Sequence, residues 1–394
     1  MNDKKNDFLL TIKTFYGAEQ VLKEELEELG YKDVVLLNRA VQLHGNLKDI
    51  YFLNFHLRCA LSILVQIASF RIKNEEDLYK QAKKIDWTTY FDVNKTFAVK
   101  GAINSDLFRN THYPFLLIKD AICDTFREKL DDRPNVEKKV PQVVIDAYIR
   151  NDEVVLSLNT SGAPLFQRGY RTETGVAPLN EVTAAILIRL SGWDRKSDFM
   201  DAFCGSGTLL VEAALLALNI PSNCERQHYA FKNFKNYDEK LWTEIYEAVN
   251  RRPQPLPFKI SGSDINSEMV MKAKRNLRAF PFGRFIDITV NDFKDVQPTS
   301  SNGTLISNPP YGERMGEELD EMYEAMGDWF KNSLQGWNCW VISSNYEAIK
   351  HIGLKPSKKI KLYNGDLECS FRKFEIFGGS RREHVLEKLD KSDD

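Results

Sequence analysis

The sequence predicts an α/β protein whose C-terminal part is a doubly wound parallel sheet and whose N-terminal part consists of α+β domains. Three observations support this prediction. From Gly169 onward, helical and strand patterns alternate with glycine-rich joints between them, which is typical of a parallel sheet with helices on both faces. Before that point, residues 8–71 follow the order βαββαβ, the split βαβ layout of a ferredoxin-like unit. At 394 residues, the chain is also too long for one ordinary domain.

The elements of the βαββαβ unit follow from apolar periodicity. Apolar and polar residues alternate from Phe8 to Thr14, as they do in a half-buried strand. Residues 18–29 carry apolar side chains at helical spacing, and Gly30 ends that helix. We expect the remaining elements to be strands at 34–37 and 40–44, a helix at 47–57 and a strand at 62–71.

A second α+β group begins near residue 74. Amphipathic spacing over residues 114–130, with proline in the first turn, predicts a long helix. The turn signal Asn151-Asp152 joins two predicted strands, at 143–150 and 153–159. A helix at 75–84 and a strand at 97–101 complete the group.

Composition and charge narrow the class of protein. Hydrophobic residues at 43% and charged residues at 28% are typical of a globular protein in water. No apolar stretch is long enough to span a bilayer and no signal-peptide core is present, so we expect a cytoplasmic protein. The six cysteines form no Cys-x-x-Cys pair and the six histidines are scattered, so we expect no metal site. A net charge of −2 does not by itself indicate nucleic-acid binding, but local cations can form a basic face. The candidate clusters are Lys83-Lys84, Arg127 with Lys129 and Arg133, Lys138-Lys139, and Arg168 with Arg171.

A glycine turn follows the first predicted strand of the C-terminal part. The strand runs from Ser197 to Asp201, and Gly205 and Gly207 precede a predicted helix at 209–218. Glycines allow a close backbone approach to a ligand, and the helix start offers free N–H groups. The turn lacks the Gly-Lys-Ser/Thr of a P-loop and the third glycine of the dinucleotide fingerprint. Taken alone, it fits a nucleoside, a dinucleotide or a purely structural turn.

Two acidic residues end the next predicted strands. Asp264 ends the strand at 258–264, and Asp292 follows the strand at 286–290. Carboxylates at the carboxyl ends of successive strands lie on the ligand edge of an open α/β sheet, where they can accept from ribose hydroxyls or an adenine amino group. Asp201 and Asp264 are 63 positions apart, so we expect an inserted excursion over roughly 220–257, with a helix around 239–249.

The tetrapeptide Asn308-Pro309-Pro310-Tyr311 is the most specific motif. It follows a predicted strand that ends at Ser307, and its prolines fix the backbone. An exocyclic amine on a base is a poor nucleophile because its lone pair is conjugated with the ring. The Asn308 side-chain oxygen and the Pro309 carbonyl can accept its two hydrogens, and Tyr311 can stack on the base. Such a reaction depends on positioning more than on a strong base.

Together these motifs resemble the class I S-adenosylmethionine (SAM)-dependent methyltransferases, and more narrowly the THUMP-domain RNA methyltransferases that make N2-methylguanine in 23S ribosomal RNA or in transfer RNA. The resemblance covers nearly the whole chain, although Ala202 stands where the family usually has proline. It is carried by Asp201–Thr208, Gly262–Ile265, Asn291-Asp292, Asn308–Arg314, and the junction segments 159–171 and 177–181.

The resemblance implies a site for SAM, an RNA partner, and a role for each motif. The glycine turn and the junction would hold the methionine part, Asp264 the ribose and Asp292 the adenine, while Asn308 to Tyr311 would hold the target base. The THUMP region would bind RNA by shape and backbone, with the base flipped into the pocket. The implied cofactor residues are Asn180, Glu181, Asp201, Phe203, Gly205, Gly207, Thr208, Asp264, Ile265, Asp292, Phe293 and Asn308. The implied catalytic residues are Asn308, Pro309, Pro310 and Tyr311, and candidate RNA contacts are Arg127, Lys129, Arg168 and Arg171.

The implied domain organisation has five parts. They are a ferredoxin-like domain (1–73), a THUMP domain (74–159, or from nearer 45 by the family's own boundary), a linker (160–170), a Rossmann-like methyltransferase domain (171–386) and a disordered tail (387–394).

Other functions remain open at this stage. Asn-Pro-Pro-Tyr suits any planar amine, so a DNA N6-adenine methyltransferase is the nearest rival, and a protein-glutamine methyltransferase uses the same tetrapeptide. From a different class, a non-catalytic RNA-binding or ribosome assembly factor could keep the fold. The sequence does not distinguish ribosomal from transfer RNA, or a monomer from a dimer.

Overall fold

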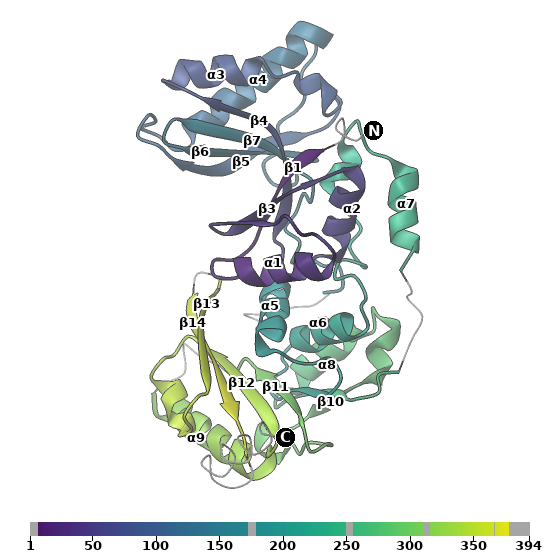
Figure 1. The fold of residues 1–394 in the computed structure, drawn as a ribbon, viewed down its shortest axis with the longest axis vertical. Coiled ribbons are helices and arrows are strands. Elements are labelled where there is room, and N and C mark those ends of the chain that lie inside the picture. The colour runs from purple at the N-terminus through teal and green to yellow at the C-terminus, as the bar shows by residue number, and fades with distance from the viewer. Residues whose placement is uncertain (1–6, 172–178, 250–254, 311–315, 366, 378–394) are drawn as a thin grey trace. The chain divides into compact units, whose positions relative to one another are not determined.

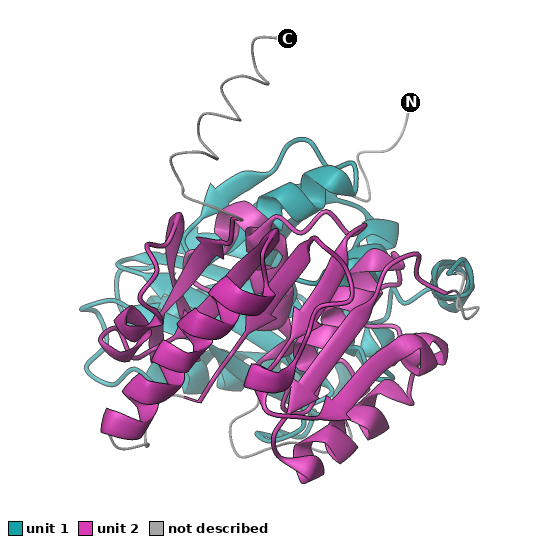
Figure 2. Cartoon of the chain, turned by 90° about the horizontal axis from the view of Figure 1, so that it is seen from below, with its two compact units in different colours: residues 1–14, 22–167, 226–249 teal, residues 15–21, 168–225, 250–394 magenta. Residues whose placement is uncertain are grey.

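The computed structural model describes residues 7–171, 179–249, 255–310, 316–365 and 367–377. The chain divides into two compact units (Figure 2). Unit 1 comprises residues 1–14, 22–167 and 226–249, and unit 2 comprises residues 15–21, 168–225 and 250–394. Among the described helices, none combines the length and the apolar composition that a bilayer span requires.

Unit 1 contains one seven-stranded sheet in the order β2-β3-β1-β4-β7-β6-β5 (Figure 1). Its strands are β1 (Phe8–Lys13), β2 (Val35–Leu37), β3 (Ala40–Gly45), β4 (Ser62–Arg71), β5 (Phe97–Asn104), β6 (Val143–Arg150) and β7 (Glu153–Asn159). Its helices are α1 (Glu19–Glu28, which begins in unit 2), α2 (Leu47–His56), α3 (Glu75–Lys83), α4 (Tyr113–Leu130) and α7 (Glu239–Glu247). These elements match the predicted order, with shifts of at most a few residues at their ends.

Strand β4 joins the two predicted N-terminal domains into a single sheet. Residues 62–65 pair with β1, and residues 64–71 pair antiparallel with β7, with a bulge between Gln66 and Ala68. The predicted division at 73/74 therefore falls just after a strand that both parts share. Main-chain hydrogen bonds continue across it, so the two parts form one structural body.

Polar caps define where the helices of unit 1 begin. The Asn46 side chain accepts from the Asp49 N–H while Asp49 accepts from the Asn46 N–H, which is a reciprocal capping box at the start of α2. Asn74 caps α3 by accepting from the Asp77 N–H, while the Asp77 carboxylate accepts from the Lys73 N–H. Helix α4 has proline in its first turn, as the sequence predicts, and ends at Asp131 in the left-handed conformation.

The predicted excursion returns to unit 1, although it lies inside the sequence range 171–386 predicted for the methyltransferase domain. Residues 226–249 belong to unit 1 and carry α7. The ring of Phe231 lies 4.5 Å from that of fully buried Tyr51 on α2, and Trp242 lies edge-on to Phe55 at 5.6 Å. Aromatic packing on α2 therefore holds the excursion.

Unit 2 contains a second seven-stranded sheet in the order β10-β9-β8-β11-β12-β14-β13. All its neighbouring strands are parallel except at β14, which runs antiparallel to both its neighbours. The strand order reverses between β8 and β11, which makes this pair the topological switch point of the sheet. The strands are β8 (Asp198–Asp201), β9 (Ile260–Asp264), β10 (Ile286–Val290), β11 (Gly303–Ser307), β12 (Trp337–Ser343), β13 (Lys358–Asn364) and β14 (Leu367–Glu375), and the helices are α5 (Glu181–Ser191), α6 (Thr208–Ala217), α8 (Ser267–Leu277) and α9 (Gly316–Ser333).

Candidate active site

The predicted site residues at the ends of β8, β9, β10 and β11 lie along the carboxyl edge of the unit 2 sheet. The register places Asp201 beside Gly262, Asp264 beside Val290, and Leu305 beside Met200. The ends of β8, β9, β10 and β11 therefore lie along one edge, across the switch point where open α/β sheets bind ligands.

The glycine turn has the backbone that the sequence predicts. Gly205 and Gly207 have φ of +52° and +83°, a region that residues with a Cβ rarely adopt. A Cβ at Gly207 would lie 3.1 Å from the Cβ of Ala273 on α8. The buried Asn276 amide of the same helix donates to the Ser206 carbonyl at 3.0 Å. Helix α8 thus fixes the turn, and the sequence offered no signal for Asn276.

Asp264 ties the turn to its neighbouring strand. Its carboxylate accepts from the Gly205 N–H at 2.9 Å and from the Asn266 N–H at 2.9 Å. Each oxygen keeps a lone pair for a further donor. Asp292 caps the short helix after β10 by accepting from the Lys294 N–H at 3.1 Å. Both carboxylates are therefore held in place by main-chain donors.

Asp201 is buried at the end of β8, with 2% of its surface exposed. The pKa of its carboxyl is raised from 3.8 to about 7, mainly by burial and to a lesser degree by the Asp264 charge, against the opposing effect of hydrogen bonds from Phe203 and Ser307. The Phe203 N–H donates to Asp201 at 3.1 Å. Asp201 is thus placed to organise the turn after β8.

Apolar side chains lie beside these carboxylates. The rings of Phe203 and Phe293 are 5.0 Å apart, and Phe293 is buried. Ile265, directly after Asp264, is 71% exposed. The solvent-exposed Ile265 side chain beside the Asp264 carboxylate can pack against the face of a planar ring.

The junction segment reaches the start of α6 through Arg171. Its guanidinium donates to the Thr208 hydroxyl at 2.7 Å and to the Leu179 carbonyl at 2.9 Å, and it pairs with Glu181 at 3.2 Å. Burial raises the pKa of Glu181, and the Arg171 charge opposes that rise. Asn180 caps α5 by accepting from the Val182 and Thr183 N–H groups. These contacts place the junction beside the glycine turn.

Burial contradicts the prediction that Arg168 and Arg171 contact RNA. The Arg168 side chain is fully buried and pairs with Glu212 at 3.4 Å. Arg171 is 13% exposed, and its donors point to Thr208, Leu179 and Glu181. The closeness of two arginines in the sequence does not reveal whether they are exposed, and here both cations hold the junction segment. Arg127 and Lys129 on α4 remain exposed, paired with Asp124 and Asp86 at 2.9 and 2.6 Å.

Asn308 carries a buried polar atom at the end of β11. Its Oδ1 is buried and has no hydrogen-bond partner among the described residues. A buried carbonyl oxygen without a donor costs about 1–3 kcal/mol, so it requires an explanation. Pro309 is buried and Pro310 is exposed. Tyr311, which we expected to stack on the base, lies outside the described residues.

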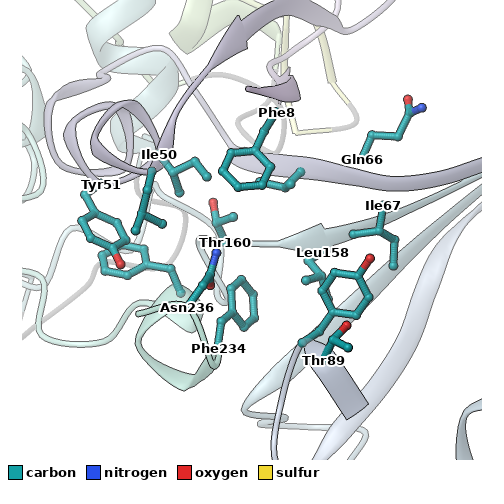
Figure 3. Close-up of a pocket in the computed structure, with 14 residues that line it drawn as sticks. Phe8, Ile50, Tyr51, Gln66, Ile67, Thr89, Leu158, Thr160, Phe234 and Asn236 are labelled. Atoms are coloured by element: carbon teal, nitrogen blue, oxygen red, sulfur yellow. The ribbon is translucent and has the colours of Figure 1, made fainter. Parts of the chain in front are cut away.

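The cavity in Figure 3 lies within unit 1 and contains none of the predicted site residues. Its volume is about 320 Å³, and Tyr51, Phe231 and Phe234 are among its lining side chains. Among the described residues, no group of three or more His, Cys, Asp or Glu could hold a metal ion.

The strand order with one antiparallel strand, the glycine turn after β8 and the asparagine after β11 define a methyltransferase of the class I fold. A family model described as the RMKL-like methyltransferase domain matches residues 168–373, more than half of the chain. The chain therefore belongs to the RMKL-like methyltransferase family. Models of the THUMP domain and the RlmL ferredoxin-like domain match residues 72–159 and 10–64. These matches confirm the resemblance that the sequence motifs carried.

Named relatives agree with this family. The chain is 38% identical over 378 residues to the "Ribosomal RNA large subunit methyltransferase K/L" of Shewanella frigidimarina, covering 94% of the chain and 53% of the relative. The chain thus spans about half the length of the curated relatives it matches.

Solved structures match over nearly the whole chain. SMU.472, assigned to the methyltransferases and crystallised with SAH, has a TM-score of 0.83 and 30% identity, with 95% of this chain and 100% of that chain covered. A predicted N6-adenine-specific DNA methylase from Listeria monocytogenes has a TM-score of 0.84 and 28% identity, covering 95% of this chain and 97% of that chain.

Proposed function

We propose that this protein transfers a methyl group from SAM to the exocyclic N2 of a guanine in 23S ribosomal RNA. The buried Oδ1 of Asn308, which has no donor among the described residues, is the observation that carries the proposal. An acceptor without a donor, at the switch point of a methyltransferase sheet, fits a site in which the missing donor is the substrate amine.

The edge residues fit SAM. Asp264 keeps free lone pairs for ribose hydroxyls, and Ile265 is exposed beside it for a face of the adenine ring. The N–H groups at the start of α6 and the glycine turn would face the methionine part. Asp292 would accept from the adenine amino group, because it follows β10 at the same carboxyl edge of the sheet as Asp264. The bound cofactor supplies an electrophilic methyl group on a positively charged sulfur.

Asn308 would prepare the nucleophile. Its Oδ1 accepts one hydrogen of the base amine, and the Pro309 carbonyl accepts the other, which leaves the nitrogen lone pair directed at the methyl. The buried setting strengthens these hydrogen bonds. The new N–C bond would replace the bond between the cofactor's sulfur and its methyl group. The nitrogen would then carry the positive charge, and the two acceptor oxygens would stabilise that charge until a proton passes to solvent water. Positioning therefore supplies most of the rate, without a strong base.

The choice of base and RNA rests on the family. The relatives named for large-subunit ribosomal RNA and the match to a THUMP domain support RNA over DNA. Guanine N2 is the base position that the family resemblance implies. Transfer RNA is the alternative RNA substrate.

The test is methyl transfer from labelled SAM to total RNA from cells that lack this gene, followed by nucleoside analysis. We expect label in N2-methylguanosine and, after size separation, in large-subunit ribosomal RNA. Label in transfer RNA alone would move the substrate to that class.

The name of one similar structure favours a second candidate function, methylation of adenine N6 in DNA. That structure is called an N6-adenine-specific DNA methylase, and an Asn-Pro-Pro-Tyr site accepts any planar amine. The same assay on unmethylated DNA decides between them. Label in N6-methyladenine of DNA, with none in RNA, would overturn the proposed substrate while keeping the role of Asn308.

A further inference from the structure

Arg372 on β14 is a buried cation that forms no ion pair with a described carboxylate. It is 6% exposed, and its guanidinium donates two hydrogen bonds to described residues, from Nε to the Ser370 hydroxyl at 3.1 Å and from Nη2 to the Tyr346 carbonyl at 3.4 Å. A guanidinium has five N–H donors, so three are left over. Burial lowers the pKa of Arg372, because the charged form is poorly solvated there.

Two other buried arginines of this chain, Arg168 and Arg226, have partners that compensate their charge. Arg168 pairs with Glu212. Arg226 donates to five main-chain carbonyls at 2.6–3.0 Å, those of Ser161, Ala163, Pro164, Gln167 and His228. Buried charges are normally compensated in one of these two ways. Within the described part of the chain, Arg372 has neither a carboxylate nor a full set of carbonyls.

Glu347 and Glu368, two acidic side chains in this part of unit 2, already have other partners. Glu347 influences the pKa of Arg372, but it receives the Lys350 ammonium on both its oxygens at 2.7 Å. Glu368, four residues earlier on β14, accepts from Lys361, Tyr346 and Tyr363. The positive charge of Arg372 is therefore available to an anion from outside the chain.

Arg372 lies in the row of the sheet that leads to the proposed methyl-acceptor site. It pairs with Val341 on β12, and Val341 pairs with Ser307 on β11, the residue before Asn308. Strands are spaced about 4.8 Å apart, so the Cα atoms of Arg372 and Ser307 are about 10 Å apart. That separation suits a group on the same nucleotide as the target base, or on the next one.

We propose that Arg372 is an anion subsite that binds a backbone phosphate of the substrate beside the target nucleotide. This inference rests on the proposed function, because it takes the substrate to be a nucleic acid. Arginine matches a phosphate through parallel N–H donors, and a phosphate contact fixes the position of a nucleotide without reading its base. With the phosphate held, the base amine reaches the Asn308 oxygen in a defined orientation.

The experiment uses a short RNA that contains the mapped methylation position. One phosphate at a time beside the target nucleotide is replaced by an uncharged methylphosphonate, with a 2′-O-methyl group on the preceding ribose for stability. Matched RNAs carry the same 2′-O-methyl group and an ordinary phosphate. Binding is measured for the wild-type protein, for Arg372→Met, and for Lys373→Met as a control. Lys373 is the next residue of the strand, points to the opposite face and pairs with Glu375.

We expect one methylphosphonate to weaken wild-type binding about ten- to hundredfold, the usual range for a hydrogen bond to a charged group. The same replacement should have almost no effect on Arg372→Met, which should also lower the slope of log affinity against log salt by about 0.7 for single-stranded RNA. Lys373→Met should respond to the methylphosphonate as the wild type does. Because the series on the wild-type protein needs no variant to fold, a destabilised Arg372→Met would not obscure the result.

Two results would overturn the subsite. In the first, the protein methylates RNA, but every methylphosphonate weakens RNA binding equally in the wild type and in Arg372→Met. The subsite is then wrong, and the proposed function still stands. The second is absence of methyl transfer to both RNA and DNA, in which case the proposed function fails as well. If DNA alone is methylated, the same methylphosphonate series is made in that DNA strand. A binding loss in the wild type that Arg372→Met does not show supports the subsite, and an equal loss in both overturns it.

Discussion

The two halves of the carboxyl edge of the unit 2 sheet differ in how their polar groups are satisfied. At the ends of β8, β9 and β10, Asp264 and Asp292 accept hydrogen bonds from the main chain, and buried Asp201 accepts one as well. Beyond the switch point, and counting only described residues, Asn308 has a buried oxygen without a donor and Arg372 has no carboxylate partner. In the first half, main-chain donors hold the carboxylates in place, whereas in the second half Asn308 and Arg372 have polar groups that a ligand would satisfy. The difference favours the second half as the site of the methyl acceptor.

The largest expected effect comes from the half with unsatisfied groups. Asn308→Ala should lower the rate of methyl transfer about 10³-fold, because it removes an acceptor that acts in the transition state. Its melting temperature should stay the same or rise slightly, because a buried unpaired oxygen is lost. Single-turnover transfer and thermal melting measure the two effects.

Asn338→Ala is the matched control. Asn338 is a half-buried asparagine near the amino end of β12, far along the strand from this edge. Full activity in Asn308→Ala would remove the proposed mechanism, and an equal loss in both variants would point to damage of the sheet.

The pH dependence of unfolding in an Asp201 variant tests the first half of the edge, at the ends of β8, β9 and β10. Its folded pKa of about 7 lies above the ordinary 3.8, so the folded protein binds the extra proton between these values. Stability from this group is therefore present at low pH and is lost as pH rises towards 7, by up to about 4 kcal/mol. Asp201→Asn should remove this dependence, so its advantage over the wild type in urea unfolding should grow from pH 5 to pH 8. A constant difference over that range would show that Asp201 does not titrate there.

Gly207 tests how strictly the glycine turn is built. Gly207→Ala places a Cβ at φ +83° and 3.1 Å from Ala273, so we expect a loss of about 2 kcal/mol and weaker cofactor binding. Gly192 caps α5 at φ +70°, where an added Cβ would have no described atom within 4 Å. Gly192→Ala should lose only about 1 kcal/mol and bind the cofactor normally. Equal effects on cofactor binding would argue against a role for the turn.

The smallest effects are expected on α4. Lys129 and Arg127 already pair with Asp86 and Asp124, so an RNA phosphate would have to compete with a carboxylate. Replacing either by Met should weaken RNA binding by less than about tenfold, in the range of an exposed ion pair. Filter binding at two salt concentrations measures this. A larger loss would place α4 at the centre of the RNA interface.

The sequence predicted local structure well and long-range partners poorly. Apolar periodicity and caps located nearly every element of unit 1, and the glycine turn, the acidic strand ends and Asn308 came together on one edge as expected. Periodicity carries no information on which strands pair, so the continuity of β4 with β7 was not predicted. Burial of Arg168 was missed because its partner Glu212 lies 44 residues away on a helix.

The same limit explains why Arg372 gave no signal. It stands between Phe371 and Lys373, and a cation on a β-strand reads as a solvent-facing residue. Only the fold shows that it is buried and that its neighbours are engaged elsewhere.

The return of residues 226–249 to unit 1 has a consequence for synthesis on the ribosome. Tyr51 and Phe55 emerge early, but the rings that cover them, Phe231 and Trp242, are translated about 180 residues later, which is roughly ten to forty seconds at about 5–20 residues per second. During that interval the nascent chain exposes an aromatic surface on α2. Unit 1 therefore reaches its final form only after part of the following unit has been made, and a chaperone that shields aromatic side chains would act in that window.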